Sequence, residues 1–447
     1  MNTITPVEVQ TAEKTHVRYW ILLVLFVVTT INHVDRATLS MAAPAIRKHL
    51  AIDPVAMGYI FAAFGWSYAI LQIPGGWLLD RFGSRLVYGS ALFFWSLMTF
   101  LQGLSGFLSG SAAFAALLML RFLLGIAEAP AFPGNSRIVS SWFPVHERGF
   151  SSAVFNSAQY FALAAFTPLM GWILAVWGWQ AVFYSMGVVG ILLGFFWFAF
   201  VNEPGAHPMV NQAEIEYIRS GGGLAGLQAG GSELRLDYVR QMLKSRMLIG
   251  VYIGQFGINT ITWFFLTWFP TYLVQAKGMS ILKAGLVASI PALLGFAGGL
   301  LGGYTSDWLL RRGRSLTFAR KTPIILGMTL SSCIVLANYV TAEWVVIALM
   351  SLAFCAKGFG ALGWVVVSDT SPKEMVGLSG GIFNFAGNLA SVATPVVIGY
   401  ILAVTDSFNG ALLYVGSMGA LGALSYLLIV GDIRRLELKK QETKARL

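Results

Sequence analysis

The chain has 447 residues, of which 56% are hydrophobic and only 11% are charged. Soluble domains carry about 25% charged residues, so the composition excludes a soluble globular protein. The net charge of +10 indicates basic cytoplasmic loops and no nucleic-acid partner, because the basic residues fall at the ends of apolar runs.

The first apolar run, at about 19–42, contains the most unusual stretch of the chain. His33-Val34-Asp35-Arg36-Ala37 places an acid beside a base where the neighbouring residues are apolar. Charge at membrane depth costs about 3 kcal/mol per group, so it persists mainly where it lines a pathway or a site. We therefore expect Asp35 and Arg36 to be functional, and the alternative is an ion pair that only locks two helices.

Eleven further runs follow, which predicts an all-α polytopic membrane protein with twelve spans. The expected limits are 19–42, 56–79, 86–108, 112–136, 150–175, 179–201, 247–274, 282–309, 322–340, 343–368, 377–403 and 410–431. A polar stretch then divides the chain into an N-terminal six-helix bundle (1–201), a cytoplasmic linker (202–246), a C-terminal six-helix bundle (247–431) and a cytoplasmic tail (432–447). Cys333 and Cys355 lie in apolar runs, so we expect small buried side chains, with no disulfide and no metal site.

Lysine and arginine are distributed unequally between the two sets of loops. Most lie beside the termini and the linker, whereas the opposite loops contain only Arg47, Lys48, Lys277 and Lys283. Because basic residues are retained on the cytoplasmic side, both termini and the linker are expected in the cytoplasm.

The two halves repeat each other. Gly76 of Gly75-Gly76 recurs 227 residues later as Gly303, and Phe155-Asn156 recurs 228 residues later as Phe383-Asn384. Parallel six-helix repeats place a substrate site between the halves, near the middle of the membrane.

Several motifs resemble those of the major facilitator superfamily. They are Gly76-Trp77-Leu78-Leu79-Asp80-Arg81-Phe82-Gly83, in which the following Ser84 replaces the usual basic residue, and Arg121-Phe122-Leu123-Leu124-Gly125. A closer similarity is to the anion:cation symporter family, and within it to the bacterial glucarate/galactarate (hexarate) transporters. It is carried by Asp35-Arg36-Ala37-Thr38-Leu39, Glu128-Ala129-Pro130, Thr267-Trp268-Phe269-Pro270 and Pro133-Gly134-Asn135-Ser136-Arg137. The resemblance implies the superfamily fold in a bacterial inner membrane, and transport of a sugar acid without enzyme activity.

The deep cations are candidates for binding an anion. The resemblance assigns the position of Arg36 to the substrate carboxylate, and a guanidinium binds a carboxylate through two parallel hydrogen bonds. Lys357 lies seven residues before Trp364, on roughly the same face of the tenth span. Arg36 and Lys357 are expected to hold the two ends of a hexarate. The alternative is that Lys357 extends to the outer interface or pairs with an acid.

Polar side chains in the spans are candidates for the sugar hydroxyls. They are His33, Tyr68, Asn156, Gln159, Trp364 and Asn384. Tyr68, Gln159, Trp364 and Asn384 match positions that line the site in the resembled family. His33 stands where those proteins often have tyrosine, and a neutral hydrogen-bonding role is favoured over proton transfer. Asn156 and Asn384 are equivalent positions of the repeat, as a pseudosymmetric pocket requires.

Two deep acids are expected to couple protons to transport. A buried carboxylate can bind and release protons in the physiological range, which suits Glu128, and the resemblance adds Asp35. Arg121 lies two turns before Glu128 and either assists it or only cross-links helices.

The ends of the spans carry a third set of charges. Asp80, Arg81, Arg85 and Asp307 are expected to hold the inward gate shut and not to touch the substrate.

Together these residues predict a proton-coupled symporter that imports a sugar-acid dianion by alternating access. A dianion entering at −100 mV faces about 4.6 kcal/mol, which two protons would offset. The expected partners are the anion, protons and membrane lipid; the protein is expected to be a monomer without cofactor or metal. The alternatives are a hexuronate or hexonate (galactonate) symporter and, more distantly, an efflux antiporter or a non-transporting sensor.

Overall fold

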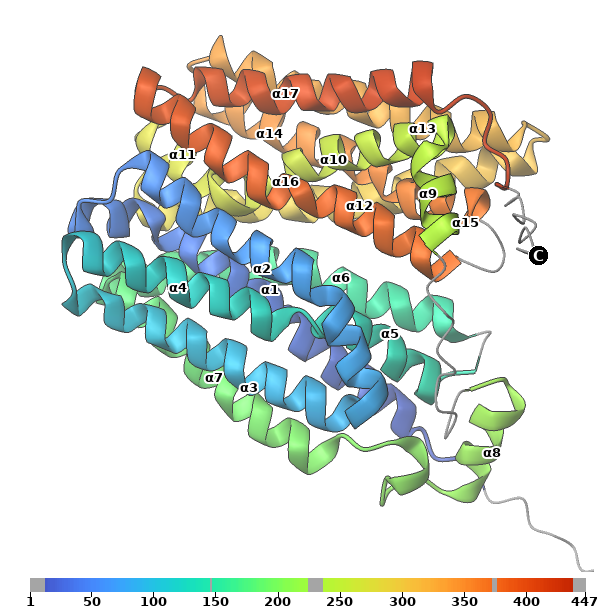
Figure 1. Ribbon diagram of the computed structural model, residues 1–447. Helices are drawn as coiled ribbons and strands as arrows, with labels where there is room; N and C mark the ends of the chain where they lie inside the picture. Colours follow the sequence, from blue (N-terminus) through green and yellow to red (C-terminus); the bar gives the residue numbers. More distant parts are fainter. Residues whose placement is uncertain (1–12, 145–146, 224–235, 372–375, 437–447) are drawn as a thin grey trace, which may run out of the picture.

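The computed structural model describes residues 13–144, 147–223, 236–371 and 376–436, without the side chains at 73, 80, 149, 236–239, 368 and 376–378 (Figure 1). Every regular element in these ranges is a helix. Twelve helical segments are long and apolar enough to cross a membrane, which confirms the predicted all-α architecture with twelve spans.

The first six spans are formed by seven helices. They are α1 (Val17–Leu50), α2 (Pro54–Phe82), α3 (Ser84–Leu104), α4 (Gly110–Glu128), α5 (Ala131–Trp142), α6 (Arg148–Trp177) and α7 (Trp179–Phe200). Asp53 caps α2 by accepting a hydrogen bond from the amide of Ala56, and Pro54 occupies its first turn. Gly83 and Gly178 separate consecutive helices at φ +81° and +85°, where an L side chain would be strained.

The second half contains more interruptions. Its helices are α10 (Arg246–Thr267), α11 (Phe269–Gln275), α12 (Ile281–Arg311), α13 (Leu316–Ser331), α14 (Glu343–Gly358), α15 (Gly363–Thr370), α16 (Val376–Thr405) and α17 (Asn409–Leu424). Short 3₁₀ segments extend α13 over Ser332–Asn338 and join α14 to α15 over Phe359–Leu362, and a π-helical turn, Ser425–Ile429, extends α17.

Two spans are broken beside candidate site residues, which the sequence pattern did not indicate. The fourth span breaks directly after Glu128, where Pro130 lacks the amide hydrogen that a continuous helix needs. The tenth span leaves the α-helical form just after Lys357. Each break therefore places a charged side chain at the end of a helix and not in its middle.

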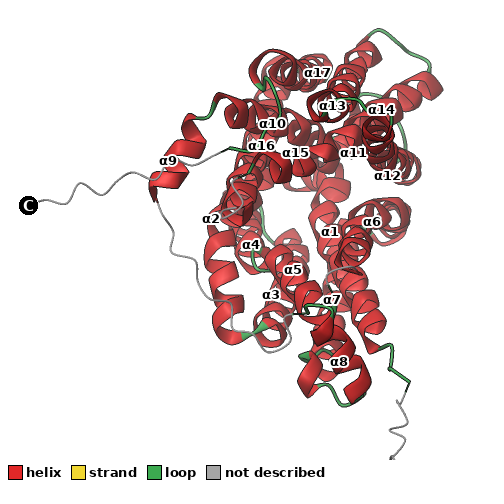
Figure 2. Cartoon of the chain, turned by 90° about the vertical axis from the view of Figure 1, so that its right-hand side faces the viewer, coloured by secondary structure: helices red, strands yellow, loops and turns green. Residues whose placement is uncertain are grey.

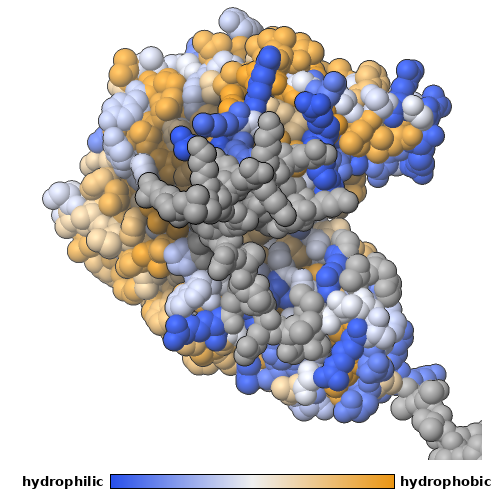
Figure 3. Space-filling view, turned by 45° about the vertical axis from the view of Figure 1, so that its right-hand side comes forward, coloured by the Kyte–Doolittle hydropathy of each residue, from blue (hydrophilic) through white to orange (hydrophobic). Residues whose placement is uncertain are grey.

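The helices form two bundles, α1–α7 and α10–α17 (Figures 1 and 2). The main contacts between bundles join α2 to α16 and α6 to α12. Glycines allow them: a Cβ added at Gly58 would lie 2.6 Å from the Pro395 carbonyl oxygen, and one added at Gly285 would lie 2.8 Å from that of Thr167. At the end that carries the linker helices the bundles diverge, and the molecular surface is hollowed between them (Figure 3).

The stretch expected to be a loop, 202–246, contains two helices, α8 (Gln212–Ser220) and α9 (Leu236–Lys244). The Asn211 side chain accepts a hydrogen bond from the amide of Glu214 at 3.0 Å and so caps α8, and Ile215 and Ile218 are buried. An Asn three residues before a Glu, ahead of apolar residues, is a recognised start signal that would have predicted α8.

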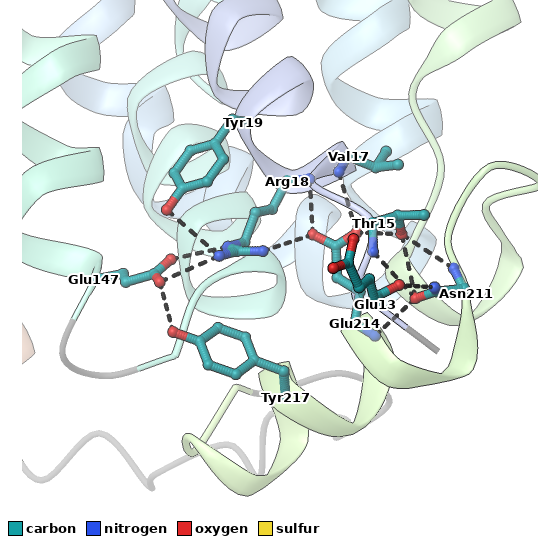
Figure 4. Close-up of polar contacts among 9 residues, drawn as sticks. All are labelled: Glu13, Thr15, Val17, Arg18, Tyr19, Glu147, Asn211, Glu214 and Tyr217. Atoms are coloured by element: carbon teal, nitrogen blue, oxygen red, sulfur yellow. Dashed lines mark hydrogen bonds and ion pairs between the residues drawn. The ribbon is translucent and has the colours of Figure 1, made fainter. Parts of the chain in front are cut away.

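A buried ion cluster attaches α8 to the N-terminal bundle (Figure 4). We call Thr15, Arg18, Glu147, Glu214 and Tyr217 the linker clamp. Arg18 lies 2.9 Å from both Glu147 and Glu214, and the Arg18 and Glu214 side chains are at most 2% exposed. Glu214 also accepts hydrogen bonds from the Thr15 hydroxyl and the Val17 amide. The Tyr217 hydroxyl donates to Glu147, and this hydrogen bond raises the pKa of Tyr217.

Candidate functional site

Two helices of the N-terminal bundle bring four charged side chains together. We call Asp35 and Arg36 of α1 with Arg121 and Glu128 of α4 the central charge cluster. The Nε atom of Arg36 donates to Oε2 of Glu128 at 2.6 Å, and this ion pair joins α1 to the end of α4. Glu128 is fully buried, whereas the Arg36 side chain keeps 11% of its surface exposed. The partner of Arg36 is therefore Glu128 and not its neighbour Asp35.

Aromatic rings of α2 cover the two arginines. The Arg36 guanidinium lies 4.9 Å from the Phe64 ring centroid and 4.7 Å from that of Tyr68, and the two rings stack. Arg121 lies 5.3 Å from the same Phe64 ring. Cation–π contacts favour a desolvated cation, so the rings help to keep both guanidinium groups in an apolar setting.

Many polar atoms of the central charge cluster lack a partner among the described residues. They are both carboxylate oxygens of Asp35, Oε1 of Glu128, and Nε and Nη1 of Arg121. Asp35 faces Trp95 and Thr99 of α3, whose polar atoms do not reach hydrogen-bond geometry with any described group. A buried polar group without a partner costs about 1–3 kcal/mol. Such a concentration of unsatisfied atoms is typical of a site that binds something.

His33 lies on α1 one turn before Ala37. Its Nδ1 is 2.9 Å from the Thr29 carbonyl oxygen, which can only accept, so Nδ1 carries the proton and Nε2 is left as an acceptor. Ala37 and Ser40 line a cavity of about 20 Å³ between the bundles, large enough for about one water. His33 shares this face of α1, at the boundary between the two bundles.

Lys357 is buried on α14. Its Nζ lies 4.9 Å from the Phe354 ring, and within the ranges that the structure describes no carboxylate or hydrogen-bond acceptor contacts it. Phe354 packs against Phe265 of α10 with the rings tilted and their centroids 4.5 Å apart. On the other side of the interface, Phe64 beneath Arg36 lies 6.1 Å from Trp263 of α10. Arg36 and Lys357 are not in contact, and α10 connects them through aromatic rings.

The remaining predicted binding residues have local partners. The Asn156 amide donates to the Ser152 carbonyl oxygen, and Gln159 donates to the carbonyl oxygen of Asn156, so both side chains bond within α6. The Trp364 ring is 43% exposed.

Asn384 has a partner in the other bundle. Its amide donates to Gln72 across the bundle interface at 3.0 Å. The repeat mates Asn156 and Asn384 thus have different environments.

The predicted gating residues bond within single bundles. Arg85 donates to the Phe198 carbonyl oxygen at 2.6 Å, and Arg81 lies over the Trp77 ring. Asp307 pairs with Arg320 at 3.4 Å, and Arg320 also binds Asp369. The side chain of Asp80 lies outside the described part of the chain.

Four residues near the cluster were not predicted from the sequence. They are Asn32, Phe64, Trp95 and Thr99. Asn32 and Thr99 are polar residues within apolar spans, a signal that could have identified them. Phe64 is one of 32 phenylalanines and Trp95 one of 14 tryptophans, so composition alone does not single them out.

Comparison with known proteins adds independent information. A profile of the Major Facilitator Superfamily matches residues 25–319. A probable galactarate/D-glucarate transporter of Bacillus subtilis is 59% identical over 434 residues, 96% of this chain and 95% of the relative. One of Escherichia coli is 54% identical over 445 residues, 98% of this chain and 99% of the relative. Among solved structures, a bacterial homologue of the human lysosomal transporter Spinster superposes with a TM-score of 0.72 at 16% identity, covering 93% of this chain and 97% of the other.

Proposed function

The chain belongs to the Major Facilitator Superfamily, and on this premise we propose that it is a proton-coupled symporter for a hexarate dianion of the D-glucarate or galactarate type. The relatives are transporters, so the chain is a transporter and not an enzyme. The substrate, the proton coupling and the direction of transport are the parts that we propose.

The ion pair between Arg36 and Glu128 carries this proposal. A substrate carboxylate must compete with Glu128 for the same guanidinium. A proton on Glu128 removes that competition, because the neutral acid no longer holds Arg36. Anion binding and proton binding therefore favour each other, and this reciprocal coupling is what a symporter requires.

Asp35 supplies the second proton site. It is fully buried beside the same cluster and neither of its oxygens has a hydrogen-bond partner among the described side chains. Two protons entering with each dianion make the cycle electroneutral and remove the cost of about 4.6 kcal/mol that a membrane potential of 100 mV imposes.

Lys357 supplies the second cation. Its position on the C-terminal bundle suits the distal carboxylate of a hexarate, so that the bound dianion draws the two bundles together. With the linker in the cytoplasm, as the distribution of basic residues indicates, the hollow at the linker end corresponds to an inward-facing arrangement. Rocking of the two bundles about the site then gives alternating access.

The coupling role is tested by Glu128→Gln in proteoliposomes. The variant keeps the size of the side chain and mimics its protonated form, so accumulation driven by a pH gradient should be lost while counterflow exchange of D-glucarate persists. Glu343→Gln is the matched control, because Glu343 is an exposed acid that pairs with Lys283 outside the site. Full pH-driven accumulation by Glu128→Gln would remove the coupling role.

A further inference from the structure

A polar pocket, separate from the central charge cluster, lies at the end of the molecule opposite the linker. It has a volume of about 440 Å³ and lies where the start of α2 and the end of α1 meet the C-terminal bundle. Its polar lining consists mainly of Arg47, Tyr272, Gln275, Lys277, Asn338 and Asp406. Ligand pockets for small molecules have volumes of about 300–1,000 Å³, so this one is large enough for a six-carbon acid.

Two of the four basic residues predicted on this side of the protein converge on the pocket. The Arg47 Nη1 donates to the side chain of Gln275 at 2.9 Å, and the Lys277 Nζ lies 3.3 Å from the Val340 carbonyl oxygen. Neither cation is paired with a carboxylate within 4 Å in the described part of the chain. The pocket therefore presents positive charge that its own acid, Asp406, does not neutralise by contact.

Tyr272 also lines the pocket. Tyr272 is 2% exposed and its hydroxyl has no hydrogen-bond partner among the described residues. Its ring lies 5.6 Å from the Lys277 Nζ. Gln275 and Asp406 offer acceptors for the hydroxyl groups that a sugar acid carries along its chain.

We propose that this outer pocket binds the sugar-acid carboxylate before the two bundles separate at this end. The inference rests on the proposed function for the identity of the anion. Arg47 belongs to the N-terminal bundle and Gln275 to the C-terminal bundle, so their hydrogen bond helps to hold this end closed. An anion that takes Arg47 replaces this bond, and recruitment of the substrate thereby assists opening toward the central site.

The test compares two lysines of the outer loops. Lys277 lines the pocket, whereas Lys283 is half exposed and pairs with Glu343, so Lys277→Gln and Lys283→Gln remove the same charge from different places. In proteoliposomes, Lys277→Gln should raise the KM for external D-glucarate about tenfold, and Lys283→Gln should leave it nearly unchanged. The KM for efflux from the linker side should stay the same in both. Equal external KM values in the two variants would overturn the proposal.

A binding measurement separates this site from the central one. In Arg36→Gln protein, whose central site is impaired, calorimetry should still detect weak binding of D-glucarate, and adding Lys277→Gln should abolish it. Loss of all binding in Arg36→Gln alone would refute an outer site. If wild-type vesicles take up no hexarate while the weak binding persists, the proposed function fails and the anion pocket stands.

The lipid composition identifies the occupant. The defect of Lys277→Gln should be the same in phosphatidylcholine vesicles and in vesicles that contain phosphatidylglycerol. A defect confined to phosphatidylglycerol would make the occupant a lipid headgroup and contradict substrate recruitment.

Discussion

The N-terminal bundle contains two buried arginine–carboxylate clusters that differ in how completely their atoms are bonded. In the linker clamp, Arg18 bonds to two carboxylates, and Glu214 accepts hydrogen bonds from the side chain of Arg18, the Thr15 hydroxyl and the Val17 amide. In the central charge cluster, Arg36 bonds to one oxygen of Glu128, and several neighbouring atoms have no described partner. On the proposed function, the linker clamp is a structural attachment, and the central charge cluster is a site whose partners can exchange.

The difference follows from what each cluster must do. Breaking a buried ion pair by removing one partner costs about 3–5 kcal/mol, because the other charge stays buried and uncompensated. The central charge cluster already contains polar atoms without hydrogen-bond partners, so a substitution there breaks fewer bonds. Those unpaired atoms can bind a proton or a ligand. The comparison therefore predicts that substitutions in the central charge cluster will mainly affect function, and that equivalent substitutions in the linker clamp will mainly affect stability.

The largest functional effect is expected from Arg36→Lys. Lysine keeps the positive charge but loses the planar fork that binds a carboxylate through two hydrogen bonds. Binding of D-glucarate should weaken about 100-fold, the equivalent of about 2.7 kcal/mol, with little change in the midpoint of thermal unfolding. Calorimetric titration measures the affinity, and unchanged affinity would show that Arg36 does not hold the substrate.

The largest effect on stability is expected from Arg18→Gln. It leaves Glu214 buried without its cation, so the free energy of unfolding should fall by about 3–5 kcal/mol. Detergent-solubilised protein should show a lower unfolding midpoint, while the folded fraction keeps the wild-type affinity for D-glucarate. Arg219→Gln provides the control, because Arg219 is an exposed residue of α8, the helix that carries Glu214. If Arg18→Gln lost affinity for D-glucarate without losing stability, the proposed difference between the two clusters would be wrong.

A smaller and selective effect is expected from Lys357→Gln. The variant should lower the affinity for a hexarate about tenfold and that for a hexonate much less, because only the hexarate has a second terminal carboxylate. Competition by the two acids in a pH-driven uptake assay measures the ratio. Equal losses for both would show that Lys357 does not bind the second carboxylate and would reopen the hexonate alternative.

The smallest effect is expected from Asn384→Ala. This change removes the hydrogen bond to Gln72 between the bundles, which contributes about 1 kcal/mol. The balance between the two orientations should shift about fivefold, visible as altered labelling of cysteines placed at the linker end. Gln72→Ala should give the same shift, and a shift in only one of the two variants would mean that the bond is not responsible.

The sequence predicts the spans well and the details of the site less well. Apolar runs of about twenty residues identify all twelve spans, because the hydrocarbon thickness fixes their length. The breaks after Glu128 and Lys357 were not predicted, because apolar composition continues through both of them, although Pro130 is a local signal for the first break. Side-chain contacts between helices could not be predicted either, because the sequence around Arg36 does not indicate that it contacts Glu128 or the Phe64 ring. Charge at membrane depth nevertheless identified both members of the central ion pair.

Proton uptake during substrate binding tests the central claim most directly. Titration of D-glucarate into the purified protein, in buffers with different ionisation enthalpies, counts the protons bound per anion. The account predicts net proton uptake with each hexarate in the wild type and a clear reduction in Glu128→Gln. Binding without proton uptake in the wild type, or the same uptake in both proteins, would contradict the proposal that Arg36 and Glu128 couple the two ligands.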